Sequence, residues 1–150
     1  MKNLRLIAIA AVAALCLMAC KKEPSVDKVQ GTYRCNLTEY TQYQKNGTWR
    51  DTAFVYRNDG TLTIKKVSDS KVDVTFSSTH GGEGAFSGVD VRDWDYIVNL
   101  SGSGSVKPAA SSYTYEARLS GSVSTEFRDL AISAALQDVS PKRIFSFTNN

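Results

Sequence analysis

Histidine is almost absent from this sequence, so acid or base catalysis by an imidazole has one candidate, His80. It lies in the glycine-rich stretch His80-Gly81-Gly82-Glu83-Gly84, which is typical of an exposed loop. Cys35 could in principle act with it as a nucleophile, but it falls on the apolar face of a predicted strand, where burial suppresses the thiolate. We therefore expect no catalytic residues and no enzymatic activity.

The sequence also lacks a hydrophobic run long enough to span a bilayer as a helix. The longest run, Leu6 to Cys20, has about 15 apolar residues where roughly 20 are needed. It follows Lys2 and Arg5 and ends in Leu17-Met18-Ala19-Cys20, which resembles the bacterial lipobox. The resemblance implies removal of residues 1–19 and attachment of diacylglycerol and further acyl chains, such as palmitate, to Cys20.

The resemblance to a lipoprotein signal also implies a location. Lys21 follows the cysteine, whereas many Gram-negative bacteria use an aspartate there to retain lipoproteins in the inner membrane. We therefore expect a lipid anchor in the outer membrane, with periplasmic and surface-facing orientations both open. Residues 20–28 are short, charged and interrupted by Pro24, as expected for a tether.

Free cysteine and surplus charge are both scarce after this processing. Cys16 leaves with the signal and Cys20 is acylated, so Cys35 is the single remaining thiol and no intrachain disulfide can form. Loss of Lys2 and Arg5 leaves 16 basic against 15 acidic residues, a net charge of +1, which gives nucleic-acid binding no electrostatic support. The remaining length suits one domain, residues 29–150, whose oligomeric state the sequence leaves open.

A convincing metal site is missing as well. The one concentration of carboxylates comprises Glu83, Asp90, Asp93 and Asp95. Its spacing matches no calcium loop, and Arg92 sits among the acidic side chains. We expect a solvated loop there, with no metal and no cofactor.

What the sequence has in abundance is alternation of apolar and polar residues with a period of two. Tyr33, Cys35 and Leu37 illustrate the apolar face of the first such segment. Asn46-Gly47, Asp59-Gly60 and Ser68-Asp69-Ser70 predict tight turns, and looser breaks follow. The predicted strands are 31–44, 48–57, 61–67, 71–79, 93–101, 112–120, 127–137 and 142–148. Only 127–137 also fits a helix, and long irregular loops are predicted at 80–92 and 102–111.

Eight sequential antiparallel strands, each with one apolar face, must bury that face and protect their edges. An eight-stranded antiparallel up-and-down β-barrel does both, and a two-sheet β-sandwich satisfies the same alternation. Within the chain, Gly31-Thr32-Tyr33 resembles the Gly-x-Trp motif of lipocalins, and Trp94-Asp95-Tyr96 is weakly similar to their second motif. The resemblance to lipocalin-like (calycin-type) lipoproteins of Bacteroidetes implies a basic residue over the first aromatic, for which Lys142 or Arg143 are candidates.

Lipocalins hold small apolar or amphipathic molecules inside the barrel. If a lumen exists here, aromatic side chains on inward faces line it. The predicted ligand-binding residues are Tyr33, Phe54, Tyr56, Phe76, Tyr96 and Tyr115. The alternative is that these rings fill the interior and that the protein is a structural or interaction module of the cell envelope, acting through its surface and loops. Asp51-Thr52-Ala53 also resembles the O-glycosylation signal of Bacteroidetes envelope proteins, with Thr52 as acceptor.

Overall fold

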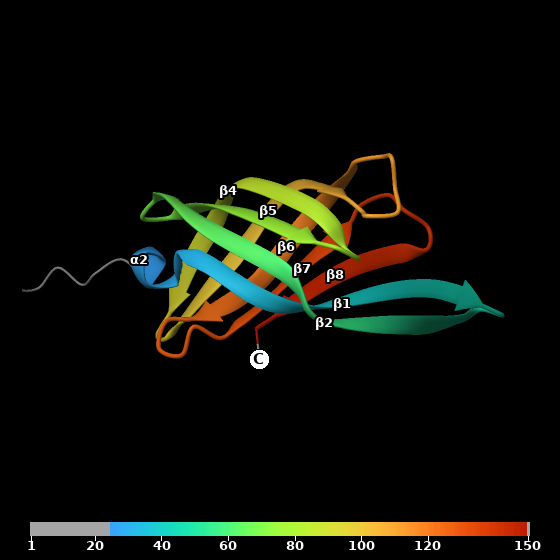
Figure 1. Cartoon of the computed structure of the whole chain (residues 1–150), viewed down its shortest axis with the longest axis horizontal. Coiled ribbons are helices and arrows are strands. Elements are labelled where there is room, and N and C mark those ends of the chain that lie inside the picture. Colours follow the sequence, from blue (N-terminus) through green and yellow to red (C-terminus); the bar gives the residue numbers. More distant parts are fainter. Residues whose placement is uncertain (1–24, 150) are drawn as a thin grey trace, which may run out of the picture.

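The alternating residues form the wall of a closed antiparallel barrel (Figure 1). The computed structural model describes residues 25–149, so the predicted signal 1–19 and the acceptor Cys20 lie outside the described residues. The strands are β1 (Gly31–Lys45), β2 (Thr48–Ser68), β3 (Lys71–Ser78), β4 (Gly82–Trp94), β5 (Ile97–Lys107), β6 (Tyr115–Ser124), β7 (Leu130–Leu136) and β8 (Lys142–Thr148). Each strand pairs with the next, and β8 closes the barrel on β1. The predicted up-and-down barrel is confirmed, and the sandwich alternative is wrong.

A short helix, α2 (Ser25–Val29), covers one end of the barrel. Val26 and Val29 are fully buried, and Asp27 forms an ion pair of 2.8 Å with Lys66 of β2. This part of the predicted tether therefore belongs to the folded body. Within residues 25–149, no helix is long and apolar enough to cross a membrane.

Large apolar side chains occupy the inside of the barrel. The rings of Phe76 and Phe147 lie 4.5 Å apart between centroids, and those of Phe76 and Phe86 lie 6.4 Å apart. These three rings, from β3, β4 and β8, meet across the interior. Around them lie the buried aliphatic side chains Leu37, Leu62, Ile64, Val72, Val74, Val89, Val98, Leu100, Val106, Leu119, Val123, Leu130, Ile132 and Leu136.

Inward-facing glycines make room for these rings. A Cβ added at Gly84 would overlap the ring of Phe76, which pairs with it across β3 and β4. A Cβ added at Gly104 would lie 2.5 Å from the ring of Phe86. Real Cβ atoms do not approach so closely, and the interior is close-packed at these points. Gly84 and Gly104 thus serve packing, which explains their presence within strands.

Two of the predicted strands are one. Asp59-Gly60 predicted a hairpin turn between 48–57 and 61–67, but β2 runs through both segments. The register with β1 shifts between Cys35 and Leu37, and Asn58 has a φ of 52°. The N–H of Asn58 donates to Oδ1 of Asn36 at 2.9 Å. The left-handed residue Asn58, directly before the predicted turn residues, thus forms a β-bulge in a continuous strand in place of a turn.

Two predicted loops are strands. Segments 80–92 and 102–111 were expected to be irregular, but most of each lies in β4 or β5. The turn between them falls at Asp95, which has a φ of 52°, inside the predicted strand 93–101. The alternating pattern divided β2 into two strands and missed β4, so the predicted number of strands is still eight. The ambiguous segment 127–137 contains β7, with Leu130, Ile132 and Leu136 buried.

The hairpin of β1 and β2 extends beyond the rest of the barrel, at the end opposite α2 (Figure 1). β2 pairs with β3 only from Gly60 onward, and β1 pairs with β8 only as far as Gln42. The tip of the hairpin is therefore a two-stranded ribbon. Thr52, the predicted glycosylation acceptor, lies just before this tip, where its partner Thr41 still pairs with Arg143 of β8, and it is half-buried.

Candidate functional site

The six predicted ligand-binding residues do not come together around a lumen. Tyr33 and Phe76 are buried, and Tyr56 and Tyr115 are partly buried against the edge of the core. Phe54 and Tyr96 are exposed by 55% and 68% and lie toward opposite ends of the molecule. The two buried members, Tyr33 and Phe76, belong to the hydrophobic core.

The positions of Phe54 and Tyr96 follow from the corrected strand boundaries. Phe54 lies on the same face of β2 as Tyr56, but it belongs to the part of β2 that no longer pairs with β3. Tyr96 lies in the turn between β4 and β5, one residue after Asp95. Neither side chain faces the interior, because each belongs to a segment beyond the region where all strands pair.

The α2 end of the barrel is closed over Tyr33. Its hydroxyl donates to the carbonyl of Val29 at 2.5 Å, and the guanidinium of Arg128 lies 5.0 Å from the centre of its ring. Nη2 of Arg128 also donates to the carbonyl of Gln30 at 3.2 Å. Burial raises the pKa of the Tyr33 hydroxyl, and the nearby positive charge of Arg128 partly offsets that effect.

Arg128, from the connection between β6 and β7, provides the basic residue that the lipocalin resemblance assigned to Lys142 or Arg143. That assignment is wrong. Arg143 lies toward the hairpin end of β8, where its Nε donates to Glu39 at 3.0 Å, and Lys142 is exposed. Arg128 was missed at the level of sequence, because no pattern in a single sequence distinguishes it from other surface arginines.

His80 is held by Asp59 at the hairpin end of the barrel. Its Nδ1 lies 3.0 Å from Oδ1 of Asp59, and its ring stacks on Tyr56 with centroids 4.1 Å apart. The hydroxyl of Ser78 donates to the same carboxylate and accepts from the N–H of Gly81 at 2.8 Å. Burial alone would raise the pKa of Asp59, but the hydrogen bonds from Ser78 and His80 lower it to about 2.

The order of these contacts decides what the cluster can do. In a serine hydrolase the serine hydroxyl bonds to the imidazole, which in turn bonds to the carboxylate. Here Ser78 and His80 both bond to Asp59, so no proton passes from serine to histidine along this chain of contacts. The arrangement fixes the turn between β3 and β4 onto the bulge in β2.

The other reactive groups are also in structural contacts. Cys35 is 1% exposed, and burial raises the pKa of its thiol to about 11. Asp90, from the acidic segment, pairs with Lys71 at 2.6 Å. Among the side chains of residues 25–149, no group of three or more His, Cys, Asp or Glu is placed to hold a metal ion.

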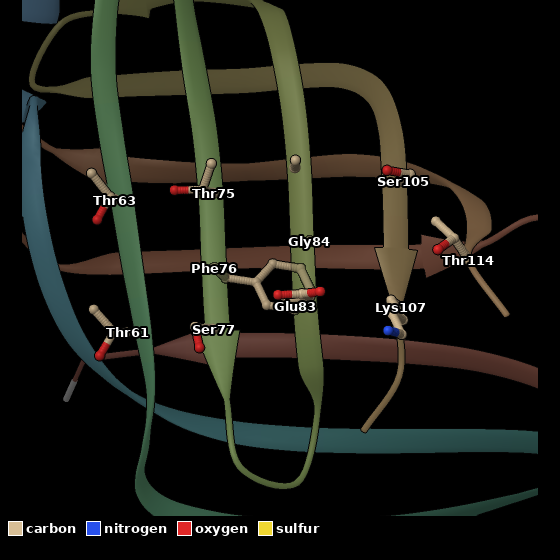
Figure 2. Close-up of a pocket in the computed structure, with 11 residues that line it drawn as sticks. Thr61, Thr63, Thr75, Phe76, Ser77, Glu83, Gly84, Ser105, Lys107 and Thr114 are labelled. Atoms are coloured by element: carbon tan, nitrogen blue, oxygen red, sulfur yellow. The ribbon is translucent and has the colours of Figure 1, made fainter. Parts of the chain in front are cut away.

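A groove of about 470 Å³ crosses the outer face of β2 to β5 (Figure 2). Hydroxyl groups dominate its lining, which also includes one acidic and one basic side chain. The lining residues are Thr61, Thr63, Thr75, Phe76, Ser77, Glu83, Gly84, Ala85, Ser105, Lys107 and Thr114. These are mostly the outward residues of the alternating pattern. No pattern in the sequence distinguishes them, because hydroxyl residues are common on the solvent face of strands.

Exposed apolar side chains gather at the two ends of the barrel. The helix-end patch, at the end covered by α2, consists of Val67, Trp94, Tyr96, Ile97 and Phe127. The hairpin-end patch consists of Tyr40, Tyr43, Trp49, Phe54, Val55 and Tyr113. Exposed apolar patches of this kind are typical of surfaces that bind a partner or a membrane.

Comparison with known proteins supports the fold. No protein-family model matches the chain, and no curated protein sequence matches it. The chain is similar to the crystal structure of a "putative outer membrane protein" from Bacteroides fragilis NCTC 9343, with a TM-score of 0.61 and 20% sequence identity. The match covers 85% of this chain and 52% of that protein, so the chain spans about half of its length.

Proposed function

We propose that this chain is a lipid-anchored protein of the bacterial outer membrane that works through its outer surface and carries no ligand inside its barrel. The observation that carries the proposal is the filled interior. The rings of Phe76, Phe86 and Phe147 meet across it, and Gly84 and Gly104 face those rings. Eight strands enclose a space that side chains can just fill, and these ring contacts support a filled interior.

The anchor rests on the sequence. The basic start, the apolar run and Leu17-Met18-Ala19-Cys20 support acylation of Cys20, and Lys21 supports export to the outer membrane. The likeness to a structure described as an outer membrane protein of a Bacteroides species is compatible with that location.

We further propose that the barrel is of the lipocalin type. Gly31 and Tyr33 open the first strand, and Arg128 lies over the tyrosine ring while donating to a backbone carbonyl at the closed end. Gly31 has a φ of 141°, which favours glycine, and a Cβ there would lie 2.7 Å from Nη2 of Arg128 and displace the guanidinium. This arrangement supports an architecture shared with lipocalins. In this proposal the barrel does not carry a ligand as lipocalins do.

The anchor is tested by labelling cells of the native host with radioactive palmitate. The full-length protein should incorporate the label, and Cys20→Ser should abolish it. Cys35→Ser is the matched control, because it removes the other cysteine of the mature chain and should leave labelling unchanged. Label retained in Cys20→Ser would refute the anchor.

The absence of a ligand inside the barrel is tested by native mass spectrometry of the mature acylated protein, released gently from detergent. We expect masses that correspond to the polypeptide and its acyl chains alone. A further small-molecule adduct that survives repeated purification would contradict the proposal and would favour a carrier of apolar or amphipathic ligands.

A further inference from the structure

We propose that the helix-end patch lies against the membrane that holds the lipid anchor, with its aromatic side chains at the level of the lipid headgroups. The inference rests on the acylation of Cys20 proposed above. It assigns an orientation to the barrel: the end covered by α2 faces the bilayer, and the hairpin end faces away from it.

The aromatic side chains of the patch come from two adjoining connections at the α2 end. Trp94 ends β4 and Tyr96 lies in the turn that follows it, and Phe127 belongs to the connection between β6 and β7. They are exposed by 75%, 68% and 71%. The N–H and Oγ1 of Thr125 donate to the carbonyl of Tyr96 at 2.8 and 3.1 Å, which joins the two connections directly.

Part of the patch lies beside the point at which the chain enters the barrel. Arg128, next to Phe127, donates to the carbonyl of Gln30, directly after α2. Lys66, next to Val67, is paired with Asp27 of α2. Two of the five patch residues therefore neighbour side chains that bind the segment leading from the anchor.

Chain length decides which end lies near the lipid. Five residue steps separate Cys20 from Ser25, and even fully extended they span about 18 Å. The 15 residues of β1 extend roughly 45 Å from the α2 end toward the hairpin tip. Because α2 and the hairpin lie at opposite ends (Figure 1), the anchor keeps the helix-end patch close to the bilayer and the hairpin tip distant from it.

The chemistry of the patch suits the lipid interface. Trp and Tyr combine a large apolar ring with one polar group, and they concentrate at the headgroup level of membranes for that reason. Phe127 and Ile97 add purely apolar surface. Membrane binding rises with the apolar area buried, so the patch adds an interfacial contact to the acyl chains and holds the barrel in one orientation.

The two tryptophans of the chain allow a direct test. Trp94 lies in the helix-end patch and Trp49 in the hairpin-end patch, and the sequence has no other. Acylated Trp49→Phe and Trp94→Phe variants each retain one reporter. Both are reconstituted in vesicles of phosphatidylethanolamine and phosphatidylglycerol, with and without brominated phosphatidylcholine as a quencher. We expect brominated lipid to quench about half of the emission of Trp94 and to leave that of Trp49 nearly unchanged.

A second set of variants separates insertion from mere proximity. In the Trp49→Phe background, Tyr96→Ser with Phe127→Ser should reduce the quenching of Trp94 by about half, because less apolar surface enters the interface. The matched control, Tyr43→Ser with Tyr113→Ser in the hairpin-end patch, should leave it unchanged. Quenching of Trp94 that persists unchanged without Tyr96 and Phe127 would overturn the proposal.

Flotation of the vesicles distinguishes failure of the anchor from failure of the docking surface. Protein that floats with the lipid while Trp94 is quenched no more than Trp49 overturns the docking surface and leaves the anchor intact. A blue shift of Trp94 in native membranes but not in pure lipid also overturns it, in favour of a protein partner. Acylated protein that does not float at all refutes the anchor and the orientation with it.

Discussion

Removal of the Phe76 ring should convert the solid barrel into one with a cavity. Phe76 is 4% exposed and packs between Phe147, whose ring centroid is 4.5 Å away, and Gly84, which has no side chain to move into the space. Phe→Ala changes in protein cores cost about 3–5 kcal/mol, and more where the surroundings cannot collapse. We expect Phe76→Ala to lower the free energy of unfolding by about 4 kcal/mol.

Thermal unfolding followed by circular dichroism measures this loss. For a domain of this size, about 4 kcal/mol lowers the melting temperature by roughly 15 °C. Phe54→Ala is the matched control, because Phe54 is 55% exposed on the projecting hairpin and should lose less than about 0.5 kcal/mol.

A small aromatic molecule then tests whether the missing ring has left a hole. Apolar cavities of this kind stay dry and bind benzene. Benzene at 100 times its dissociation constant should restore about 2.7 kcal/mol to Phe76→Ala and nothing to the parent protein. A loss of less than about 1 kcal/mol, or equal stabilisation of the parent by benzene, would refute the reasoning that the interior is filled.

Three further predictions follow from single contacts. Tyr33→Ala should lower the free energy of unfolding, measured by chemical denaturation, by about 3–5 kcal/mol, and Tyr33→Phe, which loses only the hydrogen bond to Val29, should lower it by about 1 kcal/mol. A loss under about 1 kcal/mol for Tyr33→Ala would show that the resemblance of Gly31-Thr32-Tyr33 to the lipocalin motif is accidental. Asp59 has a folded-state pKa of about 2 against an ordinary value of 3.8, so its contribution of up to about 2 kcal/mol is present above pH 4 and is lost as the pH falls toward 2. Asp59→Asn should flatten this part of the stability profile, and an unchanged slope would contradict the assignment. Cys35 should resist thiol reagents at pH 8 until the protein unfolds, and rapid labelling of the native protein would show that it is not buried as described.

The alternation of residues was enough to predict the barrel and most of its core. Leu62, Ile64, Val72, Val74 and Phe76 lie inside as expected, because a period of two can place only one face of a strand in the core. Strand boundaries were less predictable where glycine occurs. Gly84 and Gly104 read as loop residues, yet they lie in strands because phenylalanine rings occupy the space beside them. That relation between distant residues is invisible in a single sequence.

The candidate site was less predictable than the fold, for a related reason. The inward face of a strand is buried only while neighbouring strands continue beside it. Phe54 keeps the inward parity of β2 after β3 has ended, and Tyr96 lies where β4 turns back, so both are exposed. Sequence periodicity indicates on which face of a strand a residue lies, but the lengths of the neighbouring strands decide whether that face is buried in the core. The identity of the arginine over Tyr33 depended in the same way on which connection reaches the closed end.

Because the hairpin projects from the barrel, backbone amide hydrogens of this molecule should show two levels of protection against exchange with solvent. An isolated two-stranded ribbon is marginally stable in water, whereas a closed barrel opens only by global unfolding. Amide hydrogens near Trp49 and Arg50 should therefore exchange with heavy water quickly, although they lie in regular strand pairing with β1. The free edge of that ribbon exposes peptide groups to which a foreign strand could add, and the charges of Arg50, Asp51 and Arg57 along it oppose such self-association.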